Sequence, residues 1–138
     1  MHRPIRRSAL LAAALSAAAA FAIPASATER ATMIEQLRIY EIFENNKDAF
    51  HARFRDHAAR IMKTYGFDIA AMWEAKAKDR TEFVYVLRWP DEATMRESWA
   101  RFMQDAEWSK IKDSSAAEHG RMVGAIEERV MQRTSYSP

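Results

Sequence analysis

The feature that most constrains the fold of this sequence is the order of its hydrophobic patterns. Four segments alternate apolar and polar residues as β-strands do, and helical stripes separate the first segment from the second and the third from the fourth. The order strand, helix, strand, strand, helix, strand predicts an α+β fold, a ferredoxin-like βαββαβ sandwich. The predicted strands span residues 34–43, 67–75, 82–89 and 121–132.

Residues that begin and end helices stand where this pattern requires them. Asn45 and Asn46 precede the first helical stripe and offer a side-chain oxygen as a cap, and Gly66 ends that helix. Asp91 is placed to cap the second helix, and Asp105 is expected to cap a further short helix. These residues set the element boundaries that we expect.

Large apolar side chains occur on both faces of the predicted sheet. Val84 and Val86 point away from the other apolar residues of their strand, and we expect Tyr40 and Ile42 to share that second face. Two crossover helices cover only one face, and an apolar face of this size does not remain in water. Because the chain offers no other layer, the sequence predicts a homodimer whose sheets pack face to face.

The first 27 residues have the pattern of a secretory signal peptide. Residues 1–7 are basic, residues 8–23 are uncharged and alanine-rich, and Ala25 and Ala27 are small residues at the positions that a signal peptidase reads. Cleavage after Ala27 would leave a 33–138 domain in the periplasm or outside the cell, with no stable membrane anchor. An uncleaved anchor is the alternative, although the apolar run is short for a membrane-spanning helix.

The charge of the mature chain differs from that of the precursor. Three of the 21 basic residues lie in 1–27, so cleavage leaves 18 basic residues against 19 acidic residues and a net charge of −1. Nucleic-acid binding requires a basic face, so it is not expected here. With no cysteine, an exported domain has no disulfide and depends on packing or oligomerisation.

Two sets of polar residues are candidates for a site. His57 lies in the apolar stripe of the first helix, where a buried imidazole either hydrogen-bonds the sheet or acts as a base or donor in a pocket. Arg38 and Tyr40 share one face of the first strand, where the arginine either pairs across a dimer interface or anchors an anionic or carbonyl-bearing ligand.

Aromatic residues are the other candidates. Trp73 and Tyr85 belong to a dense aromatic set that either fills the core or lines a pocket for a flat ligand. No metal site is expected, because His51 and His57 are six residues apart on one helix and neither has a ligand partner at the next turn.

Four short motifs, in order, resemble those of the NIPSNAP family, a branch of the dimeric α/β-barrel superfamily. They are QLRIY at 36–40, YG at 65–66, DAEW at 105–108 and TSYSP at 134–138, and the resemblance covers residues 33–138. It implies two ferredoxin-like copies that meet as a barrel, and a family without a settled activity. Gln36 stands where the family usually has glutamate, so a proton-transfer role of that acid would be absent here.

The residues and the resemblance together give one function with two alternatives. We expect an exported domain that binds a small aromatic or apolar ligand through Arg38, Tyr40, His57, Trp73 and Tyr85. The first alternative is a cofactor-independent monooxygenase or isomerase acting on an aromatic or polyketide-like substrate, with His57 or Tyr85 as proton-transfer groups. The second is a protein interaction module. No cofactor is expected, and haem is disfavoured because residues 91–104 contain no histidine.

Overall fold

The computed structural model describes residues 33–138, which form one four-stranded antiparallel sheet with helices on one face. The signal segment expected at 1–27 lies outside the described residues. No helix within the described part of the chain is long and apolar enough to cross a membrane. The elements are β1 (Ile34–Ile42), α2 (Lys47–Arg53), η1 (Phe54–Ala58), α3 (Ala59–Thr64), β2 (Asp68–Ala77), β3 (Arg80–Trp89), α4 (Glu92–Met103), α5 (Ala106–His119) and β4 (Val123–Gln132).

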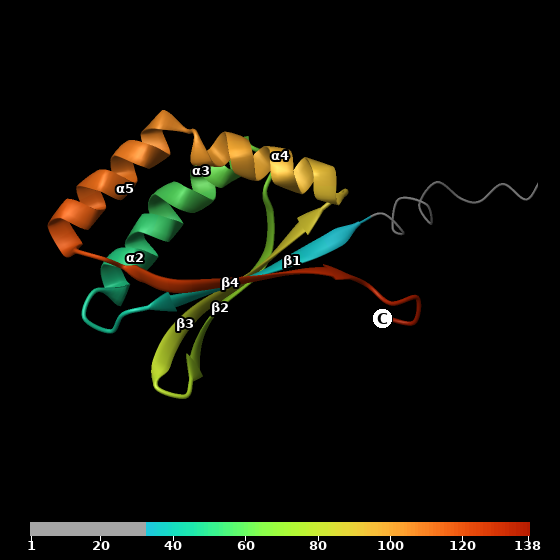
Figure 1. The fold of residues 1–138 in the computed structure, drawn as a ribbon, viewed down its shortest axis with the longest axis horizontal. Helices are drawn as coiled ribbons and strands as arrows, with labels where there is room; N and C mark the ends of the chain where they lie inside the picture. Colours follow the sequence, from blue (N-terminus) through green and yellow to red (C-terminus); the bar gives the residue numbers. More distant parts are fainter. Residues whose placement is uncertain (1–32) are drawn as a thin grey trace, which may run out of the picture.

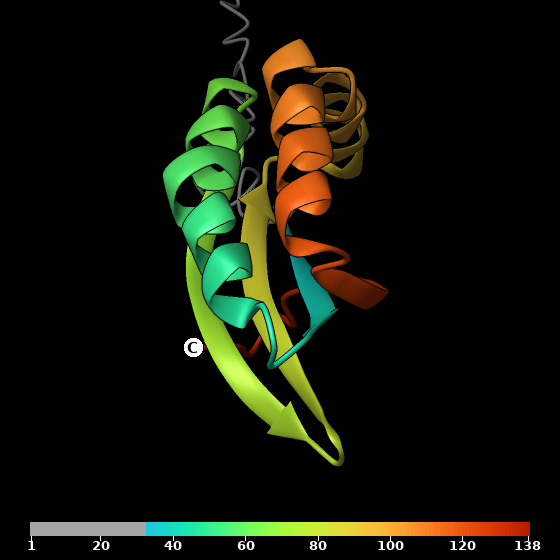
Figure 2. The ribbon, with the colours of Figure 1, turned by 90° about the vertical axis from the view of Figure 1, so that its left-hand side faces the viewer.

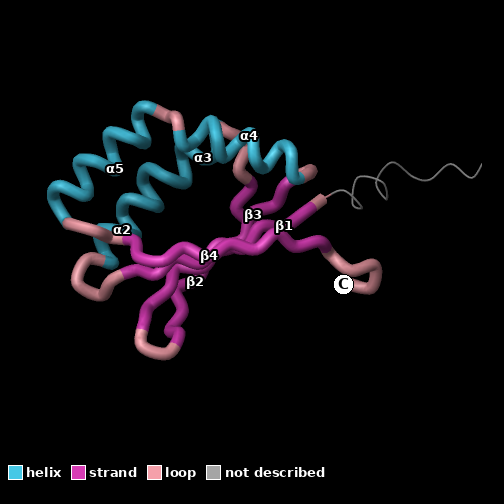
Figure 3. The backbone as a smooth tube through the Cα atoms, in the orientation of Figure 1, coloured by secondary structure: helices cyan, strands magenta, loops and turns pink. Residues whose placement is uncertain are grey.

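The strand order confirms the predicted ferredoxin-like fold. The sheet runs β2-β3-β1-β4, so the first and third strands lie in its centre and the second and fourth form its edges. Both helical connections return over the same face, and no element among residues 33–138 lies over the other face of the sheet (Figures 1 and 3). The β2–β3 hairpin extends beyond the helices (Figure 2). The sheet therefore has a covered face, on which the helices lie, and an open face on its other side.

The first helical run is continuous but contains one wide turn. α2, η1 and α3 follow one another without a break, and η1 is a π-helical turn that begins at Phe54. A π turn takes one more residue than an α turn, so it rotates the residues that follow. Phe54 and Ala58 both remain buried, whereas His57 between them is exposed. The buried position expected for His57 is therefore wrong.

The register of β1 also corrects an expectation. Tyr40 pairs with Phe83 and Ile42 pairs with Thr81, and side chains of paired residues point to the same face. Tyr40 and Ile42 therefore lie on the covered face, where Ile42 is 2% exposed, and they do not share the open face with Val84 and Val86. The apolar part of the open face includes Leu37, Ile39, Ala71, Trp73, Val84, Val86 and Met131.

A bulge in β2 separates residues that the alternating pattern places together. Ile69 pairs with Leu87 on the covered face, but Ala71 pairs with Val86 on the open face, so Ala70 is an extra residue. From this point the alternation is reversed, and Trp73 lies on the open face.

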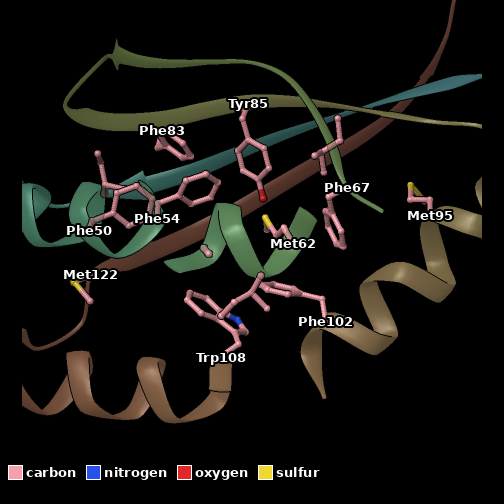
Figure 4. Packing of buried hydrophobic residues seen from close by; sticks show 14 of the residues in the cluster. Phe50, Phe54, Met62, Phe67, Phe83, Tyr85, Met95, Phe102, Trp108 and Met122 are labelled. Carbon is pink, nitrogen blue, oxygen red and sulfur yellow. The ribbon is translucent and has the colours of Figure 1, made fainter. Parts of the chain in front are cut away.

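The core lies between the covered face and the helices. Tyr85, Leu87 and Trp89 of β3 are at most 1% exposed. The rings of Phe50 and Phe54 from the first helical run lie against Phe83 and Tyr85 (Figure 4). The ring centroids of Phe54 and Phe83 are 4.7 Å apart. The central strand is thus fixed by aromatic packing, which holds the Tyr85 side chain in one place.

Two of the three expected caps are confirmed. The Asp91 carboxylate accepts from the Thr94 amide, and the Asp105 carboxylate accepts from the Trp108 amide, both at 2.7 Å. Asn46 makes no such cap; its side-chain amide donates to the His119 carbonyl at 2.9 Å. The helix that Asp105 begins is 14 residues long rather than short.

Candidate functional site

A polar cluster is enclosed between the covered face and α4. Arg38 of β1 is at its centre, with its side chain only 14% exposed. Its guanidinium ion-pairs with Glu128 of β4, the residue directly opposite in the register, and lies 4.6 Å from the ring centroid of Trp99 on α4. The arginine is therefore held by three elements, which gives its charge a fixed position.

Two tyrosines connect this guanidinium to the core through hydrogen bonds. Arg38 Nη2 donates to the Tyr40 hydroxyl at 3.2 Å, and that hydroxyl is 2.8 Å from the Tyr85 hydroxyl. Tyr85 is fully buried, and its ring contacts Tyr40 edge-on. The three residues form a hydrogen-bonded row that runs from the core to the site.

Gln36 connects the other side of the cluster. It is 1% exposed, and its amide oxygen accepts from the indole nitrogens of Trp89 at 3.1 Å and Trp99 at 2.8 Å. Its amide nitrogen donates to Glu128 at 3.0 Å. The amide accepts from both indoles and donates to the carboxylate at once, whereas a glutamate in its charged form has no donor.

The cluster opens into a pocket of about 350 Å³ between α4, β1 and β4. Arg38 Nε is buried and has no hydrogen-bond partner there. A buried donor without a partner costs about 1–3 kcal/mol, so a ligand acceptor at this position would be stabilising. The pocket is lined by Gln36, Arg38, Glu92, Met95, Arg96, Trp99, Glu128 and Val130.

The protonation states in the cluster follow from its surroundings. Burial alone lowers the pKa of the Arg38 guanidinium, but the Tyr40 and Tyr85 hydroxyls outweigh it and raise that pKa above its ordinary value. Burial, followed by the nearby Tyr40, raises the pKa of Tyr85 well above its ordinary value, although Arg38 acts in the opposite direction. Arg38 is therefore charged and Tyr85 is neutral at physiological pH.

The structure brings together three of the five predicted site residues. Arg38 lines the pocket, and Tyr40 and Tyr85 lie directly behind it. Trp73 is 52% exposed on the open face, so it is on the other side of the sheet. His57 lies on the outside of η1, in a separate groove against α5.

Three residues of the site were not predicted from the sequence as site residues. Trp99 has the spacing of a core residue, and Glu128 lies in the last predicted strand with nothing in the sequence to single it out. Gln36 flanks Arg38 and Tyr40 on their strand and stands where the family usually has an acid. The one signal in the sequence was the polar pair Gln36 and Arg38 on an apolar strand. Only the register shows that Glu128 completes it.

A larger depression of about 610 Å³ lies between the β1–α2 loop and the β2–β3 turn. Two of its cations already have partners, because Lys76 pairs with Glu44 and Arg80 pairs with Glu82. It offers no buried donor or acceptor without a partner, so we do not regard it as the site. Within residues 33–138, no three His, Asp or Glu side chains are placed to hold a metal ion.

The family of the chain follows from a comparison with family models. The NIPSNAP model matches residues 34–138, which is most of the sequence. The chain belongs to the NIPSNAP family. This confirms the resemblance carried by the four short motifs. No curated protein matches the chain.

Solved structures agree with this family and with the fold. A NIPSNAP-like domain protein from Burkholderia xenovorans superposes with a TM-score of 0.66 at 16% identity, covering 78% of this chain and 90% of that chain. A NIPSNAP family protein of unknown function from Agrobacterium tumefaciens gives a TM-score of 0.66 at 18% identity, covering 78% and 94%.

A third relative has a described activity. SnoaB, a cofactor-independent oxygenase from Streptomyces nogalater, superposes with a TM-score of 0.50 at 13% identity, covering 78% of this chain and 99% of that chain. At such identity the likeness concerns the fold alone.

Proposed function

We propose that this NIPSNAP domain is an exported binding protein for a small, neutral aromatic molecule that carries a carbonyl or hydroxyl oxygen. The observation that carries the proposal is Arg38, which lines the pocket and whose buried Nε has no hydrogen-bond partner. An oxygen acceptor on the ligand would complete the hydrogen bonding of this guanidinium.

The charges around the pocket favour a neutral ligand over an anion. Glu128 already balances Arg38, and Glu92 pairs with Arg96 at the rim. A carboxylate ligand would bring a second negative charge next to Glu128, which is unfavourable at this burial. A neutral carbonyl or phenol oxygen can accept a hydrogen bond from Arg38 without this repulsion from Glu128.

The aromatic preference rests on the walls of the pocket. Trp99 presents its indole beside the guanidinium, and Met95 and Val130 supply apolar surface. A flat ring can lie against such walls while its oxygen meets Arg38. The volume of about 350 Å³ suits a ligand of one or two rings.

Catalysis by a cofactor-independent oxygenase or isomerase is the alternative function. It requires a group that transfers a proton at the ligand, and the two candidates were His57 and Tyr85. His57 lines another groove, and the raised pKa of Tyr85 keeps its hydroxyl protonated behind Arg38 and Tyr40. The geometry therefore favours binding, and turnover is an outcome that the experiment below detects.

The proposal includes export and a second copy of the chain. Removal of residues 1–27 would release the domain into the periplasm or the medium, which N-terminal sequencing of the secreted protein would establish. The second copy would cover the open face. The apolar side chains of that face support this pairing, because Leu37, Val84 and Val86 are only half-buried in the single chain.

The decisive experiment identifies the ligand and then tests the anchor. Mass spectrometry of the mature protein under native conditions, followed by denaturation, reveals any small molecule that co-purifies. Binding of that molecule, or of 1-naphthol and 1,4-naphthoquinone as probes, is followed by tryptophan fluorescence. We expect Arg38→Gln and Trp99→Phe each to weaken binding about tenfold or more, as loss of a charged hydrogen bond does.

The control variant is Arg101→Gln on the exposed side of α4, which should leave affinity within about twofold, as surface substitutions do. Equal affinities of Arg38→Gln and the unmodified protein would contradict the proposed site. Conversion of the probe under oxygen would replace the binding function with the catalytic alternative.

A further inference from the structure

A second groove lies between the first helical run and the last helix. α2 and η1 run beside α5 (Figure 2), and the space between them forms a groove of about 350 Å³. Its apolar floor is made of short side chains, with Ala49 and Ala52 on one helix and Ile111 on the other. This groove shares no lining residue with the Arg38 pocket.

Arg53 is the unusual residue of this groove. It is half-buried, Nη1 donates to the Ser115 hydroxyl at 3.0 Å, and the guanidinium carbon lies 5.6 Å from the ring centroid of Trp108. Among residues 33–138, no carboxylate lies within ion-pair distance of it. Arginine stays charged in proteins, and a partly buried charge without a counter-ion is costly. The remaining donors of Arg53 therefore favour an anion from outside the chain.

Two histidines line the same groove as Arg53, one from each wall. His57 comes from η1 and His119 from the end of α5, and both line the groove. The wide turn explains the position of His57, because it rotates this residue out of the buried stripe. Imidazole N–H groups are hydrogen-bond donors, so both histidines can assist in binding an anion.

The two carboxylates that line the groove are already engaged. Asp56 accepts two hydrogen bonds from Arg55, at 2.7 and 2.9 Å, and Glu118 lies 3.6 Å from His119. They do not form a metal site with the histidines, since the described residues contain no group of three such ligands placed for a metal ion. Among the described residues Arg53 is therefore the arginine of the groove without an ion-pair partner, while the carboxylate of Glu118 is largely exposed and contacts only His119.

We propose that this groove binds a small oxyanion, a carboxylate or a phosphate monoester on a compact apolar body, with Arg53 as its anchor. The apolar part lies over the alanine and isoleucine floor. Ser115 holds the guanidinium in place, and His57 and His119 donate from the walls. This site is independent of the neutral-ligand pocket at Arg38, so either proposal can fail without the other.

The experiment titrates the mature protein with inorganic phosphate, phenyl phosphate and benzoate. NMR signals of the His57 and His119 rings and the fluorescence of Trp108 report on the groove. We expect saturable shifts at both histidines, and tighter binding of phenyl phosphate or benzoate than of phosphate alone. Arg53→Gln should weaken binding about tenfold or more, as for loss of a charge-assisted hydrogen bond. Arg60→Gln, an exposed arginine of the same helical run paired with Glu107, is the matched control and should change it less than about twofold.

Two further variants keep the test decisive if Arg53→Gln does not fold. Arg53→Lys keeps the charge but loses the planar fork, so it should bind with intermediate affinity. Glu118→Gln removes a negative charge beside the anion and should strengthen binding several-fold, whereas a cation site would be weakened. No saturable binding of any of the three anions, unchanged affinity in the Arg53 variants, or Zn²⁺ binding that Glu118→Gln abolishes would overturn the proposal.

Discussion

At the scale of single residues, Gln36 best shows how one side chain organises a site. Its amide joins two indoles and one carboxylate, so the positions of Trp89, Trp99 and Glu128 depend on it. A residue that is 1% exposed on a central strand is normally apolar. Here all of its hydrogen-bonding groups are used, and the cost of burial is offset.

The first prediction replaces this amide with an acid. Gln36→Glu keeps the acceptor for both indoles but places a second carboxylate against Glu128, so we expect a loss of about 2 kcal/mol in unfolding free energy at neutral pH. Burial and the like charge would raise the folded-state pKa of the new acid. The deficit is then full above the raised folded-state pKa and shrinks as the pH falls from there towards the unfolded pKa of about 4.3, below which the acid is neutral in both states.

Urea unfolding at several pH values measures this loss, and the double variant Gln36→Glu/Glu128→Gln is the control. It restores a donor opposite the new acceptor, so it should recover part of the lost stability. A Gln36→Glu protein as stable as the original at every pH would show that the two residues do not interact.

At the scale of elements, Asp105 joins two helical segments. Its carboxylate caps α5 at the Trp108 amide and also accepts from the Tyr65 hydroxyl at 2.7 Å, at the end of the first helical run. The hydrogen bond from Tyr65, then that from Trp108, lowers the pKa of Asp105 below its ordinary value. Asp91 caps α4 without such a second partner from another helix.

The second prediction compares these two caps. Asp105→Ala should lower the urea midpoint of unfolding more than Asp91→Ala, because it removes a contact between helices as well as a cap. Since the folded-state pKa of Asp105 is depressed, its stabilisation is present above the unfolded value of about 3.9 and is lost as the pH falls through the folded value. Asp105→Asn keeps a cap oxygen and should remove that acid dependence; equal effects of the two alanine variants would contradict the comparison.

The elements and their order could be predicted from the sequence, because helical stripes, strand alternation and caps are local patterns. The face to which each side chain points could not be predicted in the same way, because a bulge or a wide turn inserts one extra residue and reverses or rotates the side chains that follow. Ala70 in β2 reversed the face of Trp73, and the wide turn at Phe54 moved His57 outward. The site was found only in part, because Glu128 reaches Arg38 through a strand register that no local pattern shows.

At the scale of the whole molecule, the open face is the apolar surface that a partner would have to cover. Leu37, Ile39, Val84 and Val86 are only half-buried in the single chain, and Trp73 is 52% exposed beside them. A second copy packed against it would remove this apolar surface from water. This is the assembly included in the proposed function.

The third prediction tests that assembly. Trp73→Glu places a charge in the centre of the proposed interface, so we expect the mass by light scattering to fall from two chains to one. Met103→Glu, on the exposed side of α4, changes an equally exposed apolar residue outside the open face and should leave the mass unchanged. A single-chain mass for the unmodified mature protein at micromolar concentration would exclude the dimer.

The extra residue in β2 also has a consequence for how sequences of this kind are compared. Because Ala70 faces no partner, a chain that lacks one residue between Ile69 and Trp73 can form a regular strand with Trp73 still opposite Val84. A one-residue gap at this place in an alignment therefore indicates that β2 bends differently. It does not indicate that different side chains lie on the open face. The segment between Ile69 and Trp73 can therefore vary in length by one residue while the side chains after it keep their positions on the open face.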